Sequence, residues 1–100
     1  MDRIKVGIVG GSGYTGLELL RILRSHPLVE VTWISSESFA EKSLEEYCPA
    51  WTKRTLLEFS SLSKQGVPSP VDAVFLALPH GESMSHLKLF SPEVKVIDLS

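Results

Sequence analysis

Three glycines spaced three residues apart are the residues of this chain best suited to bind a ligand. Gly10, Gly13 and Gly16 follow the β-branched segment 4–9 and open an amphipathic segment. A strand, a tight turn and a helix in that order would direct the free N–H groups and the positive dipole end of the helix at whatever lies over the turn. The spacing therefore predicts a site for a phosphate group.

Each of these glycines has a separate expected role. Gly10 makes the turn, Gly13 lets the backbone approach a pyrophosphate, and Gly16 lets the helix pack closely on the sheet. A sharp corner alone would need one or two glycines rather than three at fixed spacing. Ser12 and Thr15 are candidate hydroxyl donors to the phosphate, and the alternative is that they cap the helix.

A polar segment, Ser35-Ser36-Glu37, ends the second apolar segment of the chain. NAD-binding folds often place an acidic residue there, on the ribose 2′-hydroxyl. Two hydroxyls suit the 2′-phosphate of NADP better than a carboxylate does, because like charges repel. The Glu37 carboxylate would repel the 2′-phosphate, and Lys42 is the nearest cation in the sequence. On balance this chemistry favours NADP over NAD; the alternative is a solvated polar turn.

Two further residues invite a chemical role. His80 lies between Pro79 and Gly81 at the end of an apolar run, where it either contacts the nicotinamide or a phosphate, or is a surface histidine of a turn. Cys48 has no histidine or exposing glycine turn beside it in the sequence, which favours a structural cysteine over a nucleophile. No Ser-His-Asp arrangement and no metal-ligand spacing is evident.

The elements that must position these residues alternate between strand and helix. Apolar runs predict strands at residues 4–9, 29–34, 55–59, 72–78 and 94–99, and helical periodicity predicts helices at 14–25, 43–47 and 82–90, with 60–70 as a connection. This order indicates an α/β fold with a Rossmann-like, doubly wound, mainly parallel sheet. Ligands of such sheets lie beyond the carboxyl ends of the strands. The turns that begin at Gly10, Ser35 and Pro79 are all expected at that edge.

Composition limits the function classes. The 100 residues suit one domain, and 43% of them are hydrophobic, which excludes a disordered chain. A net charge of −2 argues against nucleic-acid and anionic-membrane partners, and no apolar run approaches the ~20 residues of a membrane helix. One cysteine and no signal peptide predict a cytoplasmic protein. A last strand without a covering helix leads us to expect residues 1–100 to be an NAD(P)-binding domain at the front of a larger two-domain protein.

Three segments carry a resemblance to a known family. Residues 9–19 (VGGSGYTGLEL), 74–83 (VFLALPHGES) and 96–100 (VIDLS) resemble N-acetyl-gamma-glutamyl-phosphate reductase. That family is the NADPH-dependent reductase of arginine biosynthesis and is related to aspartate-semialdehyde dehydrogenase. The segments occur in the order of the family, and together they span the chain.

The resemblance implies a cofactor site for NADP formed by three groups of residues. They are Ser12, Gly13, Tyr14, Thr15 and Gly16 over the pyrophosphate, Ser35 and Ser36 near the adenosine ribose, and Pro79 and His80 near the nicotinamide. Family members often carry a basic residue after the second strand, where this chain has Glu37.

The implied substrate is a small-molecule acyl phosphate. In the family, a thiolate displaces phosphate to form a thioester, and hydride from NADPH reduces the thioester to an aldehyde. The family's catalytic cysteine and histidine come later than Ser100, so no catalytic residue is expected in this span, and Cys48 lacks the family's context. We expect the full-length protein to be a homo-oligomer.

Two alternatives remain open. One is the cofactor domain of a different acyl-phosphate reductase, acting on aspartyl phosphate or on a carrier-protein-linked substrate. The other is a non-enzymatic dinucleotide-sensing domain. A downstream cysteine motif would exclude the second alternative, and a gene that ends at Ser100 would favour it.

Overall fold

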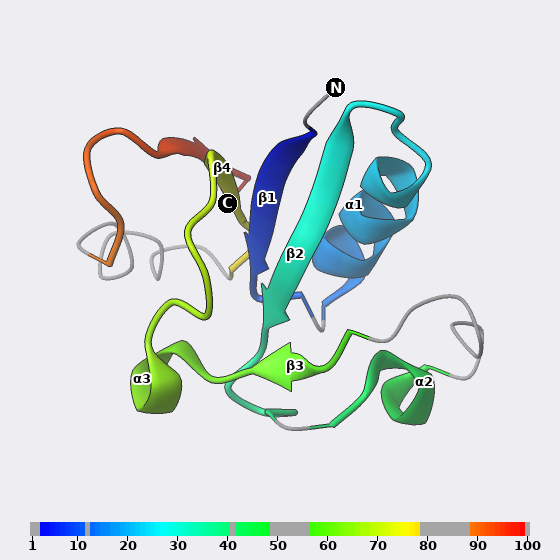
Figure 1. Cartoon of the computed structure of the whole chain (residues 1–100). Helices are drawn as coiled ribbons and strands as arrows, with labels where there is room; N and C mark the ends of the chain where they lie inside the picture. The colour runs from blue at the N-terminus through cyan, green and yellow to red at the C-terminus, as the bar shows by residue number, and fades with distance from the viewer. Residues whose placement is uncertain (1–2, 12, 41, 49–56, 79–88, 100) are drawn as a thin grey trace.

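The described part of the chain forms one five-stranded parallel sheet with helices packed against it (Figure 1). The computed structural model describes residues 3–11, 13–40, 42–48, 57–78 and 89–99. In chain order its elements are β1 (Ile4–Val9), α1 (Tyr14–Arg24), β2 (Val29–Ser35), α2 (Leu44–Tyr47), β3 (Phe59–Ser60), α3 (Leu62–Gln65), β4 (Ala73–Leu76) and β5 (Lys95–Asp98).

The strand order is β3-β2-β1-β4-β5, and each neighbouring pair is parallel. The chain therefore moves outward from β1 to β2 and β3, and then returns to place β4 on the other side of β1. The reversal of direction lies between β1 and β4. In open α/β sheets ligands bind beyond the carboxyl ends of the strands at such a reversal. The sheet thus assigns the loop after β1 and the loop after β4 to a candidate site.

Two buried clusters cover the two faces of the sheet. On one face α1 and α2 pack on the sheet, and the buried side chains are Ile8, Leu20, Ile34, Leu44 and Phe59. On the other face the first residue of α3 joins the sheet residues, and the buried side chains are Val9, Trp33, Leu62, Val74 and Leu76. Alternate residues of β1 and β2 enter opposite clusters, as the side-chain alternation of a strand requires. The predicted doubly wound parallel sheet is confirmed.

The predicted first strand and first helix agree closely with the structure. β1 has the predicted bounds, and α1 ends at Arg24 because Ser25 is its C-cap. The apolar stripe of α1 faces the sheet, with Leu20 and Leu23 buried. Its polar face carries an exposed ion pair between Glu18 and Arg21.

The segment after β3 differs from the prediction. Residues 60–70 were expected to be a connection, but Ser60 belongs to β3 and α3 forms one turn of helix within that range. The Ser61 hydroxyl caps α3 by accepting from the N–H of Lys64 at 3.2 Å, and Gly66 ends it with φ +73°. β3 also begins later than predicted, at Phe59.

Residues 82–88 of the helix expected at 82–90, and residues 55–56 of the strand expected at 55–59, lie outside the described residues. Among the helices that the structure describes, none is long and apolar enough to cross a membrane.

Candidate functional site

The turn after β1 folds back on the end of β2. The N–H groups of Gly10 and Gly11 both donate to the carbonyl oxygen of Ser35, at 3.1 and 2.8 Å. Gly10 has φ +79°, a backbone conformation that residues with a Cβ rarely adopt. A Cβ there would also lie 2.8 Å from the carbonyl oxygen of Ala77, just after β4. The predicted turn-making role of Gly10 is confirmed, and the turn lies at the reversal between β1 and β4.

Two other glycines allow close packing within the same turn. A Cβ on Gly16 would lie 2.6 Å from the Cα of Gly11 and 2.8 Å from the carbonyl oxygen of Gly10. Gly16 was predicted to let the helix pack closely on the sheet; the close contact that the structure shows is with the backbone of the turn, so that α1 begins directly against the turn. Gly11 had no predicted role, yet a Cβ there would lie 2.1 Å from Cγ1 of Ile34 on β2.

Gly13 differs from the other glycines of the turn because no contact among the described residues requires a glycine there. It is the N-cap of α1, with φ −82° and ψ 172°, which is ordinary extended backbone. A Cβ there would have no atom of the residues that the structure describes within 4 Å. The space above Gly13 is therefore open at the start of α1, where the N–H groups of a first helical turn lack intrahelical partners.

The start of α1 is electrostatically suited to an anion. Its first turn contains no acidic residue, and its two basic residues in the last turn lie at the far end. Glu18, one turn further on, pairs with Arg21. A glycine N-cap has no side chain to accept from the free N–H groups, so the positive end of the helix dipole faces the open space above Gly13. Tyr14 and Thr15 are both exposed there. The N-cap is Gly13 rather than Thr15, so the capping alternative for Thr15 is wrong.

Ser35 and Ser36 lie at the same edge but are buried, with 2% and 5% of their surfaces exposed. The Ser35 carbonyl anchors the glycine turn, as described above. The Ser36 hydroxyl accepts from the N–H of Phe39 at 3.2 Å, and the Ser36 N–H donates to the carbonyl oxygen of Ser60 at 3.0 Å. Their contact with an adenosine ribose stays a prediction.

Among the described residues at this edge, the Glu37 side chain forms the most extensive set of hydrogen bonds. The sequence did not predict these hydrogen bonds. The Glu37 carboxylate accepts from the hydroxyls of Ser61 and Ser63 and from the N–H groups of Leu62 and Ser63. The hydrogen bond from the Ser63 hydroxyl, followed by those of Ser61 and the two N–H groups, lowers the pKa of Glu37 against the opposing effect of burial.

We expect these hydrogen bonds to make stability depend on pH. A carboxyl whose folded-state pKa is lowered stabilises the fold above its unfolded-state pKa, which is about 4.3, and this contribution is lost as pH falls through the folded-state value. Wild type should therefore be more stable than Glu37→Gln at pH 7, and the difference should shrink below about pH 4. Denaturant unfolding at pH 7 and pH 3.5 measures the difference in the free energy of unfolding between wild type and Glu37→Gln. The control is Glu93→Gln, which changes an exposed carboxylate. A difference independent of pH would contradict the assignment.

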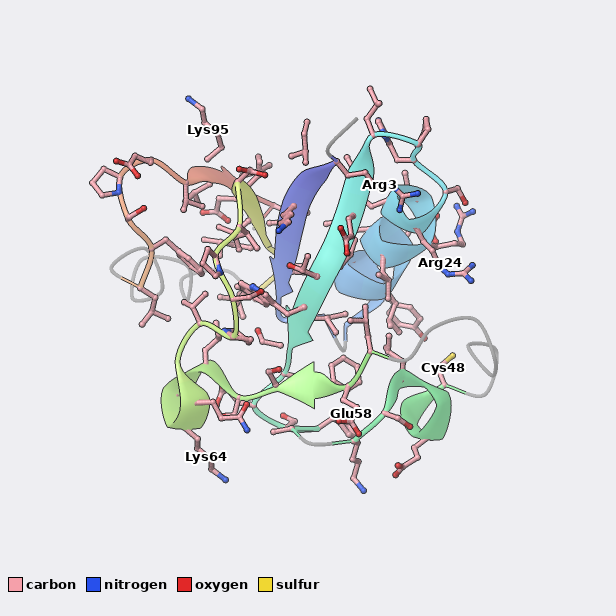
Figure 2. All side chains as sticks on the ribbon, viewed as in Figure 1. Arg3, Arg24, Cys48, Glu58, Lys64 and Lys95 are labelled. Carbon is pink, nitrogen blue, oxygen red and sulfur yellow. The ribbon has the colours of Figure 1, made fainter. Side chains whose placement is uncertain are left out.

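Other candidates lie away from this edge or outside the described residues. Cys48 follows α2, and Figure 2 shows its sulfur beside that helix, on a part of the chain distinct from the glycine turn. Ser12, Pro79 and His80 lie outside the described residues, so their predicted contacts stay predictions. Leu78, which directly precedes Pro79 in the sequence, approaches Gly10, since a Cβ on Gly10 would lie 2.9 Å from its Cδ2.

A cavity lies at the opposite, amino edge of the sheet. Its volume is about 350 Å³, and Figure 2 shows Arg3 and Arg24 close to the end of α1 there. It is lined by Arg3, Leu20, Arg24, Val29, Glu30, Val31 and Leu57. Because it lies at the other end of the strands, it is separate from the glycine turn.

The geometry at the carboxyl edge agrees with comparisons to known proteins. Residues 5–100 match the family described as "Semialdehyde dehydrogenase, NAD binding domain". The chain belongs to this family. The predicted relationship to aspartate-semialdehyde dehydrogenase and its relatives is thereby confirmed, and the family description agrees with a turn suited to a dinucleotide phosphate.

Two related reductases align with nearly the whole chain. The N-acetyl-gamma-glutamyl-phosphate reductase of Acinetobacter baylyi is 48% identical over 98 residues, which cover 97% of this chain and 28% of that protein. The [LysW]-L-2-aminoadipate/[LysW]-L-glutamate phosphate reductase of Saccharolobus solfataricus is 43% identical, covering 99% of this chain and 28% of that protein. The chain thus spans a little over a quarter of the length of these oxidoreductases.

A solved structure shows the same fold. Aspartate semialdehyde dehydrogenase from Candida albicans, determined with NADP, matches with a TM-score of 0.70 at 19% identity. The match covers 97% of this chain and 29% of that one. The similarity supports the Rossmann-like assignment made from the strand order.

Proposed function

We propose that this chain is the NADP-binding domain of an acyl-phosphate reductase. The observation that carries the proposal is the open space above Gly13 at the start of α1. Gly10, Gly11 and Gly16 are each required by the packing or the backbone of the turn, whereas in the described part of the chain no contact requires a glycine at Gly13. A small residue that the fold does not need is explained by a ligand that approaches the backbone there, as a pyrophosphate does in dinucleotide-binding turns.

The residues present suit such a cofactor along the carboxyl edge. Gly13, Tyr14 and Thr15 would lie against the pyrophosphate, and Ser35 and Ser36 near the adenosine ribose. Pro79 and His80 are proposed for the nicotinamide end. Bound NADPH would supply hydride for the reduction of a carbonyl carbon. The chain's own part is to bind and orient the dinucleotide, and no catalytic residue is proposed within it.

For the complete enzyme we propose reduction of N-acetyl-glutamyl 5-phosphate to N-acetyl-glutamate 5-semialdehyde and phosphate, a step of arginine biosynthesis. The support is the set of relatives with that reductase name, which are 43–48% identical over the chain. A carrier-protein-linked substrate is the second candidate, because the reductase of S. solfataricus is also 43% identical. A cytoplasmic location and a homo-oligomeric state of the complete enzyme are further parts of this proposal.

Calorimetric titration of the chain with NADPH and NADH tests the cofactor proposal. We expect one binding site, tighter binding of NADPH, and no reduction of N-acetyl-glutamyl 5-phosphate by the chain alone. Absence of binding by either dinucleotide would refute the proposal. NADPH-dependent turnover by the chain would refute the assignment of catalysis to residues outside it.

A further inference from the structure

An acidic residue after the second strand of a βαβ unit usually has a direct role in choosing the dinucleotide. Its carboxylate accepts from the ribose 2′-hydroxyl of NAD and would repel the 2′-phosphate of NADP. Glu37 follows β2 by two residues and is exposed. A chain that binds NADP must therefore keep this carboxylate away from the ribose.

The structure shows how the carboxylate is held. One oxygen of Glu37 accepts from the hydroxyls of Ser61 and Ser63, the first at 2.8 Å. The other oxygen accepts from the N–H groups of Leu62 and Ser63, at 3.0 and 3.4 Å. All four donors belong to the start of α3, so both carboxylate oxygens are engaged by a single element.

That element packs on the opposite face of the sheet from α1, the helix that the glycine turn opens. Leu62 of α3 and Leu20 of α1 belong to the two buried clusters on opposite faces. β2 lies between β1, which carries the glycine turn, and β3, which leads into α3. The hydrogen bond from the Ser36 N–H to the carbonyl oxygen of Ser60 joins the loop after β2 to the end of β3. The Glu37 carboxylate is thus held at the start of α3, whose first residue packs on the opposite face of the sheet from the helix that the glycine turn opens.

We propose that Ser61 and Ser63 are positioning residues that set the cofactor preference by holding the Glu37 carboxylate at the start of α3. This inference rests on the proposed NADP-binding function. With the contact formed, the Glu37 carboxylate does not oppose a 2′-phosphate at the end of β2. With the contact broken, Glu37 is free to turn toward the ribose, where it accepts from the 2′-hydroxyl of NADH and repels the 2′-phosphate of NADPH.

The test compares the ratio of the NADH to the NADPH dissociation constant in three chains: wild type, Ser61→Ala/Ser63→Ala, and the same double variant with Glu37→Gln. We expect the double variant to lower the ratio about tenfold, because a freed charge discriminates between the two dinucleotides. The added Glu37→Gln should restore the wild-type ratio, because glutamine carries no charge. Circular dichroism checks that each variant folds.

The outcomes separate this inference from the proposed function. If the serines only stabilise α3, the double variant loses thermal stability and binds both dinucleotides less tightly by the same factor. The ratio of the two dissociation constants then stays unchanged. An unchanged ratio overturns this inference and leaves the proposed function standing. A lowered ratio that Glu37→Gln does not restore also overturns it, because the effect would not arise from the carboxylate. If wild type binds neither dinucleotide, the proposed function fails and the inference fails with it.

Discussion

Replacing Gly13 with valine is expected to weaken NADPH binding strongly while leaving the fold intact. The backbone at Gly13 has φ −82° and ψ 172°, which a β-branched residue adopts readily, and a Cβ there meets no atom of the described residues within 4 Å. The valine methyl groups would instead fill the space proposed for the pyrophosphate. We expect roughly 100-fold weaker NADPH binding, which corresponds to about 3 kcal/mol.

Calorimetry measures the affinity, and thermal unfolding confirms the fold. The control is Glu30→Val, which adds the same side chain at the opposite edge of the sheet, beside the amino-edge cavity. It should leave NADPH affinity unchanged. If the Gly13 variant is folded and binds NADPH as wild type does, the pyrophosphate does not lie over this turn.

Replacing Gly16 with alanine is expected to destabilise the whole domain. The new Cβ would lie 2.6 Å from the Cα of Gly11 and 2.8 Å from the carbonyl oxygen of Gly10, and both contacts are with backbone that cannot rotate away. Overpacking of this kind costs about 1–3 kcal/mol. For a domain of this size, the melting temperature should fall by about 5–20 °C.

The matched control is Gly13→Ala, the same chemical change three residues earlier in the same turn. Its Cβ meets no atom of the residues that the structure describes, so the melting temperature of this variant should stay within a few degrees of wild type. Thermal unfolding followed by circular dichroism compares the two variants. Equal stability of both would show that α1 does not need close contact with the turn.

Local sequence patterns predicted most of the sheet and the roles of two glycines. β4 is a continuous apolar run, and β1 is β-branched apart from Lys5 and Gly7; apolar runs of this kind belong to strands covered on both faces. The spacing of Gly10 and Gly16 was enough to predict a turn and a close helix contact, since both requirements arise within a few residues of each glycine.

The features that the sequence did not reveal depend on contacts between distant residues. Gly11 is required because Ile34, on the neighbouring strand, occupies the space of its Cβ. α3 is only four residues long, and its first turn is stabilised by Glu37, which lies 24 residues before Ser61. Ser35 was predicted to act through its hydroxyl, whereas the contact that the structure shows is made by its backbone carbonyl.

The most direct test of the dinucleotide site is to follow the backbone amide signals of the chain by NMR during titration with NADPH. We predict that the signals that move are those of Gly11, Gly13, Tyr14 and Thr15, together with Ser36 after β2. The amides of Arg3 and Arg24, at the amino edge, should not move. Shifts confined to the amino edge, or no shifts at saturating NADPH, would contradict the proposal that this turn binds the cofactor.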